Sequence, residues 1–214
     1  SFSSHTHTHT HRTLVEFAKH HPGKRLLYLV FNVAVREHAE KIFPKNTQVK
    51  SVHKMAFAKI GRRYAHKMKD ELKIPIVLEC LRRRRDARTQ PQFANLVVST
   101  LKRFFLSSAK SIDSEHLCAA ARRNLTSTLE TANFVWNIMK DREDNALPMT
   151  HNGYLKLYHL CTPRLHESYD IILLDEAQDT NEVIRDLVLS QKCGKVIVGD
   201  RHQHDLVSLK LFGQ

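Results

Sequence analysis

Two short apolar runs, each ending in acidic residues, constrain the fold of this chain more than any other feature of its sequence. The first run covers 171–174 and leads into Asp175 and Glu176, and the second covers 195–199 and leads into Asp200. The residues between the runs have the apolar spacing of a helix. A strand, a crossover helix and a second strand fit this length. The pattern therefore predicts two parallel strands that carry carboxylates at their ends.

The first third of the chain shows the same alternation of strand and helix patterns. Apolar runs rich in valine, leucine and aromatic residues predict buried strands, and apolar residues three or four positions apart predict helices. The expected elements are a strand over 24–31, a helix over 33–43, a strand over 47–52 and a helix over 53–68 that is interrupted or ends near Gly61. This order is typical of a parallel sheet with helices in its connections.

The middle of the chain differs, because residues 74–151 show amphipathic helical patterns and no clear strand. We interpret this segment as a helical insertion. Trp136 lies in it among apolar neighbours, so we expect this ring in the core rather than on a surface where it stacks on bases. After the insertion, Thr180 is expected to cap the crossover helix, and Cys193 and Gly194 are expected to end it.

The acidic residues at the two strand ends suggest a site. In open parallel sheets, ligands bind outside the carboxyl ends of the strands. Asp175, Glu176 and Asp200 would lie there side by side, where one carboxylate can hold Mg²⁺, a second can polarise an attacking water and a third can sense a terminal phosphate. That is the layout of a site for nucleoside triphosphate hydrolysis. The alternative is a set of solvated acids at turns, which the regular pattern around both strand ends disfavours.

The chain is strongly basic, with 34 lysine and arginine residues against 22 aspartate and glutamate residues and a formal net charge of +12. Such an excess favours a polyanionic partner, nucleic acid first, and the alternative is a solvated basic surface without a specific partner. The basic run 81–88 is either a phosphate contact or nuclear signal, or a solvated helix end. No apolar run is long enough to span a membrane. The four scattered cysteines form no CxxC pair, which favours a reducing compartment over a disulfide scaffold.

Several segments resemble the motifs of one enzyme family. The segment 173–179, LLDEAQD, together with 198–203, VGDRHQ, resembles motifs II and III of the UvrD-like superfamily 1 DNA helicases. The segment 28–44, YLVFNVAVREHAEKIFP, looks like their motif Ia, and 149–160, MTHNGYLKLYHL, is close to the eukaryotic F-box DNA helicase branch. The resemblance extends over about residues 12–203.

The resemblance implies an α/β fold, namely a P-loop NTPase-like (RecA-like) parallel sheet flanked by helices, with an inserted all-helical subdomain. In these terms the chain divides into a low-complexity His/Thr tail over 1–13, the first part of the motor domain over 14–73, the helical insertion over 74–165 and the second part of the motor domain over 166–214.

The family also implies a function, an ATP-dependent helicase or translocase that moves 3′ to 5′ on single-stranded DNA, in the nucleus and in DNA repair or recombination. Mg²⁺ would be its cofactor, ATP its substrate, and ubiquitin-ligase or repair-complex components its partners. By position, the residues would be Asp175, Glu176 and Gln203 for catalysis, with Asp175 as the magnesium ligand, Gln178, Asp179 and Asp200 for nucleotide binding, and Phe31, Asn32 and His53 for DNA binding.

The sequence departs from the family where a glycine-rich phosphate-binding loop is expected. Such a loop cradles phosphate with backbone N–H groups and a lysine. Here the segment 5–13 reads HTHTHTHRT, Thr10 takes the place of the lysine, and no glycine precedes Gly23. We therefore expect the phosphate cradle to be absent.

Four histidines alternate in this segment, at positions 5, 7, 9 and 11. In an extended chain they would share one face and bind Zn²⁺ or Ni²⁺ weakly, and the alternative is a disordered low-complexity tail. Two functions also stay open for the whole chain. The acidic motifs favour an ATP-dependent helicase, and the missing glycine loop favours a non-catalytic nucleic-acid-binding remnant of one.

Overall fold

The computed structural model describes residues 4–30, 33–83, 90–175, 177 and 180–199. The chain divides into two compact units, one from residues 1–55 and 162–214 and one from residues 56–161. We call the first the sheet unit and the second the helical unit.

The sheet unit contains a four-stranded sheet in which every neighbouring pair is parallel, with the strand order β2–β1–β5–β6. Its elements are α1 (Ser4–Lys19), β1 (Leu26–Val30), α2 (Val33–Ile42), β2 (Thr47–Ser51), the start of α3 (Val52–Lys59), η4 (Leu165–Glu167), β5 (Ile171–Leu174), α8 (Glu182–Leu189) and β6 (Gly194–Ile197). The predicted strand, crossover helix and parallel strand at the end of the chain are confirmed.

Strand β1 lies at the centre of this sheet and is its most buried part. All five of its residues, LLYLV, are at most 2% exposed. The strand runs in register with β5, from Leu26 opposite Ile171 to Leu29 opposite Leu174. A strand that is apolar at every position has both faces covered, which explains why its sequence does not alternate.

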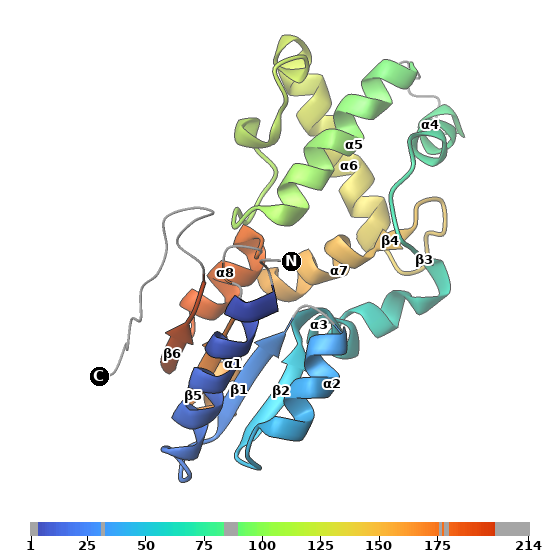
Figure 1. Cartoon of the computed structure of the whole chain (residues 1–214). Helices are drawn as coiled ribbons and strands as arrows, with labels where there is room; N and C mark the ends of the chain where they lie inside the picture. The colour runs from blue at the N-terminus through green and yellow to red at the C-terminus, as the bar shows by residue number, and fades with distance from the viewer. Residues whose placement is uncertain (1–3, 31–32, 84–89, 176, 178–179, 200–214) are drawn as a thin grey trace. The chain divides into compact units, whose positions relative to one another are not determined.

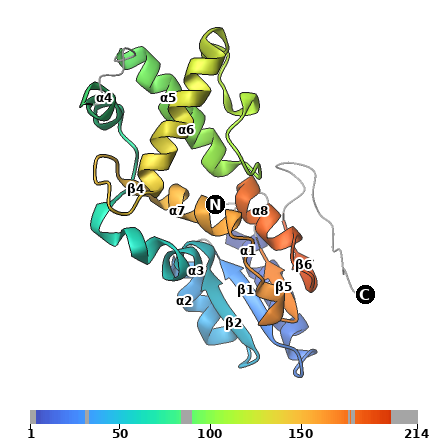
Figure 2. The same cartoon turned by 180° about the vertical axis from the view of Figure 1, so that it is seen from behind.

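Helices cover both faces of the sheet (Figure 1, Figure 2). On one face, Leu14 and Ala18 of α1 and Phe43 at the end of α2 form a continuous core with Tyr28 of β1 and Leu173 of β5. Helix α8 lies on the other side, with its apolar stripe buried. The prediction of a parallel sheet flanked by helices is therefore confirmed.

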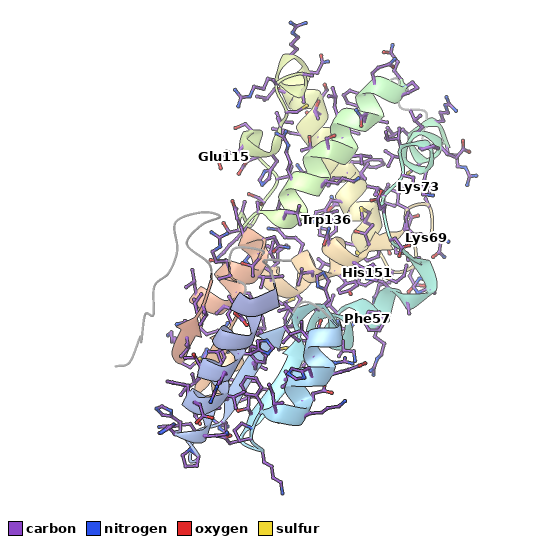
Figure 3. All side chains as sticks on the ribbon, in the orientation of Figure 1. Phe57, Lys69, Lys73, Glu115, Trp136 and His151 are labelled. Carbon is purple, nitrogen blue, oxygen red and sulfur yellow. The ribbon has the colours of Figure 1, made fainter. Side chains whose placement is uncertain are left out.

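The helical unit packs α5 against α6 and α7. Its elements are η1 (Gly61–Lys67), β3 (Met68–Lys69), α4 (Ile74–Arg83), α5 (Pro91–Leu106), η2 (Ser114–His116), η3 (Ala121–Asn124), α6 (Leu125–Lys140), β4 (Met149–Thr150) and α7 (His151–Leu160). Trp136, labelled in Figure 3, is 4% exposed, and its ring lies 4.9 Å from that of Phe105 on α5. The prediction that Trp136 belongs to the core is confirmed. In the part of the chain that the structure describes, no helix combines the length and apolarity needed to cross a bilayer.

The buried side chain of Lys67 caps the C-terminal end of α6. The Lys67 ammonium donates to the backbone carbonyls of Ile138 at 3.2 Å and Asp144 at 2.7 Å, and also to that of Asp141. These carbonyls lie at and just beyond the helix end, where backbone acceptors lack partners and a positive charge is favourable. Burial lowers the pKa of the Lys67 ammonium, because the charged form loses its hydration.

The division of the chain differs from the predicted one. The sequence predicts the insertion over 74–165, whereas the compact helical unit covers 56–161. The first boundary lies earlier because η1 and β3, which precede residue 74, belong to this unit. The helical unit also contains two short strands, since Met68 and Lys69 of β3 pair in parallel with Met149 and Thr150 of β4. Strands of two residues are too short to leave an alternating pattern in the sequence.

The N-terminal segment also differs, because α1 already begins at Ser4 and includes residues that the sequence predicts as a tail. Leu14, Val15 and Ala18 anchor this helix on the sheet. Once a helix is nucleated, each further residue that becomes ordered adds one hydrogen bond, so the helix can extend toward the N-terminus. Alternate positions of a helix do not share one face. Among the residues that the structure describes, no group of three or more side chains is placed to hold a metal ion.

Helix α8 differs from its prediction at both ends. Its N-cap is Asn181, whose side chain accepts a backbone N–H at 3.0 Å, whereas the Thr180 hydroxyl donates to the Ala177 carbonyl at 2.7 Å. Both residue types are good caps, so composition does not choose between them. The helix ends before the expected pair of Cys193 and Gly194, because Gly194 is already the first residue of β6.

Candidate functional site at the carboxyl edge of the sheet

Asp175 lies at the carboxyl edge of the sheet, directly after β5. The preceding residue, Leu174, pairs with Leu29 of β1 on one side and with Ile197 of β6 on the other. Asp175 thus follows a strand that is held from both sides, and its side chain is only 7% exposed. The structure places this carboxylate at the edge where ligands of open parallel sheets bind.

Tyr28 and His11 both contact the Asp175 carboxylate. The Tyr28 hydroxyl donates to Oδ2 at 3.3 Å, and Nε2 of His11 lies 3.4 Å from the same oxygen. The His11 nitrogen and the Tyr28 oxygen are themselves 2.7 Å apart. With the imidazole proton on Nε2, His11 donates to Tyr28 and Tyr28 donates to Asp175, so the three side chains form one connected network.

The sequence explains why these three side chains meet. Tyr28 lies on the face of β1 that α1 and α2 cover, and its ring stacks on Phe43 with 4.6 Å between centroids. His11 precedes Leu14 and Val15 by three and four positions, so it lies on the face that anchors α1 to the sheet. The rings of His11 and Tyr28 pack edge to face, with 5.6 Å between their centroids and 82° between their planes.

The chain beyond Asp175 turns along the end of β6. The Val198 amide donates to the Leu174 carbonyl at 2.8 Å, and the Ala177 amide donates to the Val198 carbonyl at 3.1 Å. The two strands that precede the acidic segments are therefore adjacent and parallel, as the sequence predicts. Asp200 itself lies outside the described residues.

His53 lies on the same edge as Asp175 but not beside it. It is the second residue of α3, which follows β2 directly, and β1 lies between β2 and β5. Two strand spacings, about 10 Å, therefore separate the two strand ends. The other predicted site residues lie outside the described residues, and their roles stay predictions: Phe31, Asn32, Glu176, Gln178, Asp179, Asp200 and Gln203.

The sequence motifs alone do not point to Tyr28 or His11 as contacts of Asp175. Tyr28 is the one polar-tipped residue in the apolar run of β1, and such a hydroxyl needs a partner when its strand is buried. His11 directly follows Thr10, the residue that takes the lysine position of the expected loop. These two signals were available in the sequence, because the residue after that lysine normally faces the same carboxylate.

The segment aligned with the phosphate-binding loop is helical. Helix α1 runs from Ser4 to Lys19, and beyond the first turn of a helix each backbone N–H is bonded to the carbonyl four residues earlier. Those N–H groups are not available to cradle a phosphate.

The described donors around Asp175 do not fit magnesium. Mg²⁺ requires near-octahedral oxygen ligands at about 2.0–2.1 Å and usually keeps several waters. The described groups here are one carboxylate, one phenol and one imidazole, and imidazole suits zinc, copper or nickel better than magnesium. The role of Asp175 as magnesium ligand stays a prediction that these donors do not support.

A second constellation, in the helical unit, resembles a catalytic triad but caps a turn. Ser107 Oγ lies 2.9 Å from His116 Nε2, and Asp113 Oδ1 lies 2.9 Å from His116 Nδ1. However, the Asp113 backbone amide donates to that Nδ1 at 3.1 Å, and the Ser107 hydroxyl donates to the Phe104 carbonyl at 3.0 Å. A triad needs Nδ1 to donate to the carboxylate. Asp113 and His116 therefore form a capping box for η2, and Ser107 contacts the other ring nitrogen of His116.

Comparisons with known proteins agree with this architecture. A family model described as the UvrD/REP helicase N-terminal domain matches residues 3–204. F-box DNA helicase 1 of Gallus gallus is 34% identical over 207 residues, which cover 89% of this chain and 20% of that protein. F-box DNA helicase protein 1 of Schizosaccharomyces pombe is 31% identical over 217 residues, which cover 90% of this chain and 24% of that protein.

The chain thus spans about a fifth to a quarter of the length of these curated relatives. The match nevertheless extends through both segments of the sheet unit and through the helical unit between them. Because this family model matches residues 3–204, the chain belongs to the UvrD/REP helicase N-terminal domain family.

Proposed function

We propose that this chain is a motor domain of an ATP-dependent DNA helicase or translocase of the UvrD type. The observation that carries the proposal is the buried Asp175 at the end of β5, on the carboxyl edge of a parallel sheet. Relatives named as F-box DNA helicases support DNA as the polymer. For the whole protein we propose 3′ to 5′ movement, a nuclear location, a task in DNA repair or recombination, and ubiquitin-ligase or repair-complex partners.

Binding of single-stranded DNA is the activity that we propose for the chain itself. The net charge of +12 favours contact with phosphates, and His53 lies on the carboxyl edge of the sheet. Phe31 and Asn32 join it in the proposed DNA track. Stacking of a base on Phe31 would add about 1–3 kcal/mol, and it would be tolerant of sequence because every base has an aromatic face.

A non-catalytic nucleic-acid-binding role is the second candidate, and the arrangement around α1 favours it for the isolated chain. The segment aligned with the phosphate-binding loop is helical, and Asp175 is contacted by His11 and Tyr28. Loss of a cradle removes several charge-assisted hydrogen bonds, each worth about 1.5–3 kcal/mol. We therefore expect the chain alone to bind DNA without hydrolysing ATP, whereas Glu176, the proposed activator of water, would act only in a complete site.

Two measurements on the chain test these proposals. We expect phosphate release from ATP to stay at background with and without single-stranded DNA, because the cradle is missing. Turnover that disappears in Glu176→Gln would show a working site and reject the non-catalytic alternative. We expect fluorescence anisotropy of labelled oligonucleotides to show weak binding at low salt, and a chain that binds none would reject both functions.

A further inference from the structure

His11 stands where a metal-binding hydroxyl is expected. In a G-x-x-x-x-G-K-[ST] loop, the residue after the lysine supplies a hydroxyl to Mg²⁺, next to an aspartate from a neighbouring strand. With Thr10 in the lysine position, that residue here is His11. The structure brings its side chain to the corresponding aspartate, with Nε2 3.4 Å from Asp175 Oδ2.

The imidazole is fixed in this position from several sides. Its Nε2 lies 2.7 Å from the Tyr28 hydroxyl, and its ring packs edge-on against the Tyr28 ring. On another side it stacks on the His38 ring of α2, with 6.3 Å between centroids and 17° between planes. The side chains of His11 and Asp175 are only 15% and 7% exposed. Residues of β1 and α2 thus fix the position of the His11 ring, which α1 carries to this edge of the sheet.

The imidazole and a magnesium ion would compete for the same oxygen. An ion bound to Asp175 Oδ2 would sit about 2.0–2.1 Å from it and would need further oxygen ligands and water around it. Nε2 lies 3.4 Å from that oxygen, and the Tyr28 hydroxyl lies 3.3 Å from it, so both groups stand inside the shell that the ion and its waters require.

We propose that the His11 imidazole takes the place of the magnesium ion beside Asp175, so that the chain satisfies this carboxylate with its own side chains. The inference rests on the proposed function only in placing a nucleotide site at the carboxyl edge of the sheet. It does not require that the chain binds DNA or hydrolyses ATP. Its consequence is that a smaller hydroxyl side chain at position 11 opens a site for a hard divalent cation, with Asp175 as a ligand.

The first test measures binding of Mn²⁺, a paramagnetic substitute for Mg²⁺, by the loss of its free electron paramagnetic resonance signal. We expect His11→Ser to bind Mn²⁺ at least tenfold more tightly than the wild-type chain, and we expect Asp175→Asn in the same variant to abolish the gain. His20→Ser is the matched control, because His20 directly follows the same helix and its ring bonds locally, to the Glu16 carbonyl at 2.8 Å. The other histidines give a background that all variants share.

The second test does not depend on metal binding. In ¹⁵N-histidine spectra, the His11 signals are assigned as those lost in His11→Gln. We expect Asp175→Asn to shift them, and we expect Asp70→Asn, which changes an exposed carboxylate beside His151, to leave them in place.

The possible outcomes separate the inference from the proposed function. Asp175-dependent Mn²⁺ binding by the wild-type chain would overturn the inference while supporting a nucleotide site at this edge. Absence of a gain in His11→Ser, or a His11 signal that ignores Asp175→Asn, would also overturn it. None of these results depends on whether the chain binds DNA.

Discussion

Two carboxylates mark the opposite ends of β5, and each is satisfied in a different way. Asp175 at the carboxyl end is held by Tyr28 and His11. Asp170 at the amino end faces Arg25, whose Nη2 lies 3.0 Å from Oδ1 and whose backbone amide donates to Oδ2 at 2.8 Å. Arg25 and Asp170 precede the neighbouring strands β1 and β5, so this pair joins the two strands where they begin.

The Arg25 contact makes the stability of the fold depend on pH. Hydrogen bonding by the Arg25 guanidinium, followed by that of its backbone amide, lowers the pKa of Asp170 from 3.8 to about 2. The folded state therefore binds this proton less readily than the unfolded state, so the contribution to stability is present above about pH 4 and is lost as the pH falls toward 2.

We expect Asp170→Asn to lower the midpoint of thermal unfolding at pH 6, and we expect the difference from the wild-type chain to shrink as the pH approaches 2. Circular dichroism melts across this range measure it. Glu167→Gln is the matched control, because its side chain pairs only with Arg164 on an exposed turn, where ion pairs contribute little. A difference that is constant over the whole pH range would show that the charge of Asp170 is not responsible.

At the scale of elements, one ammonium group contacts three backbone carbonyls at and just beyond the end of α6. Replacing Lys67 with methionine keeps the length of the side chain but leaves the carbonyls of Ile138, Asp141 and Asp144 without this donor. We expect a loss of about 1–3 kcal/mol in the free energy of unfolding, the usual cost of buried acceptors left without a partner. Urea denaturation measures this loss.

Lys69, labelled in Figure 3, provides the control for that experiment. It lies two residues further on, in β3, and its side chain is exposed. We expect Lys69→Met to change the unfolding free energy by at most about 0.5 kcal/mol, as surface substitutions usually do. Equal losses in the two variants would show that α6 does not depend on the Lys67 ammonium.

The elements themselves were predictable where pattern and tertiary environment agree. Strand β1 and strand β5 are buried on both faces, so they appear in the sequence as unbroken apolar runs. The interruption near Gly61 was predictable as well. A Cβ atom at this position would lie 2.6 Å from Phe57 Cδ2 and 3.0 Å from Tyr154 Cγ, so the close packing requires glycine.

The misses come from interactions between residues that are distant in the sequence. No local pattern indicates that residues 4–10 continue α1, since histidine and threonine are weak helix formers. The network of His11, Tyr28 and Asp175 joins positions up to 164 residues apart, so motif matching found the aspartate alone. The boundary of the helical unit was likewise misplaced, because pairs such as Met68 with Met149 leave no signal in either segment.

At the scale of the whole molecule, the basic excess is unevenly divided. The helical unit contains 19 lysine and arginine residues against 10 aspartate and glutamate residues, a net charge of +9, and the sheet unit contains 15 against 12, a net charge of +3. Cations that contact DNA phosphates release counterions and set the dependence of affinity on salt. We therefore expect the helical unit to supply most of the salt dependence.

With about four to six phosphates neutralised, the slope of log K against log salt should lie near −3 to −4. Replacing the exposed pair Arg62 and Arg63 with glutamine should reduce the magnitude of this slope by about 1, since each phosphate contact on a single strand contributes about 0.7 to the slope. Phe31→Ala should weaken binding without changing the slope, because it removes no charge. Anisotropy titrations at several salt concentrations measure both effects.

The matched charge control is the pair Lys19 and Lys24. Both are exposed and lie at the amino edge of the sheet, at the end of α1 and before β1, whereas His53 follows the carboxyl end of β2. We expect their replacement with glutamine to leave the slope nearly unchanged. An equal flattening by the two pairs would show that only the total charge matters and would reject the expectation that the helical unit supplies most of the salt dependence.

The strand order also means that the two neighbours of β1 are synthesised at different times. Strand β1 lies between β2, which ends at Ser51, and β5, which begins at Ile171. A ribosome that adds roughly 5–20 residues per second takes about 6–24 s to cover that interval. During this time β1 has one neighbouring strand and one unpaired edge, although all five of its residues are buried in the complete sheet. The residues of the helical unit are synthesised during this interval. Until β5 is synthesised, the unpaired edge of β1 is therefore accessible to chaperones and to other nascent chains.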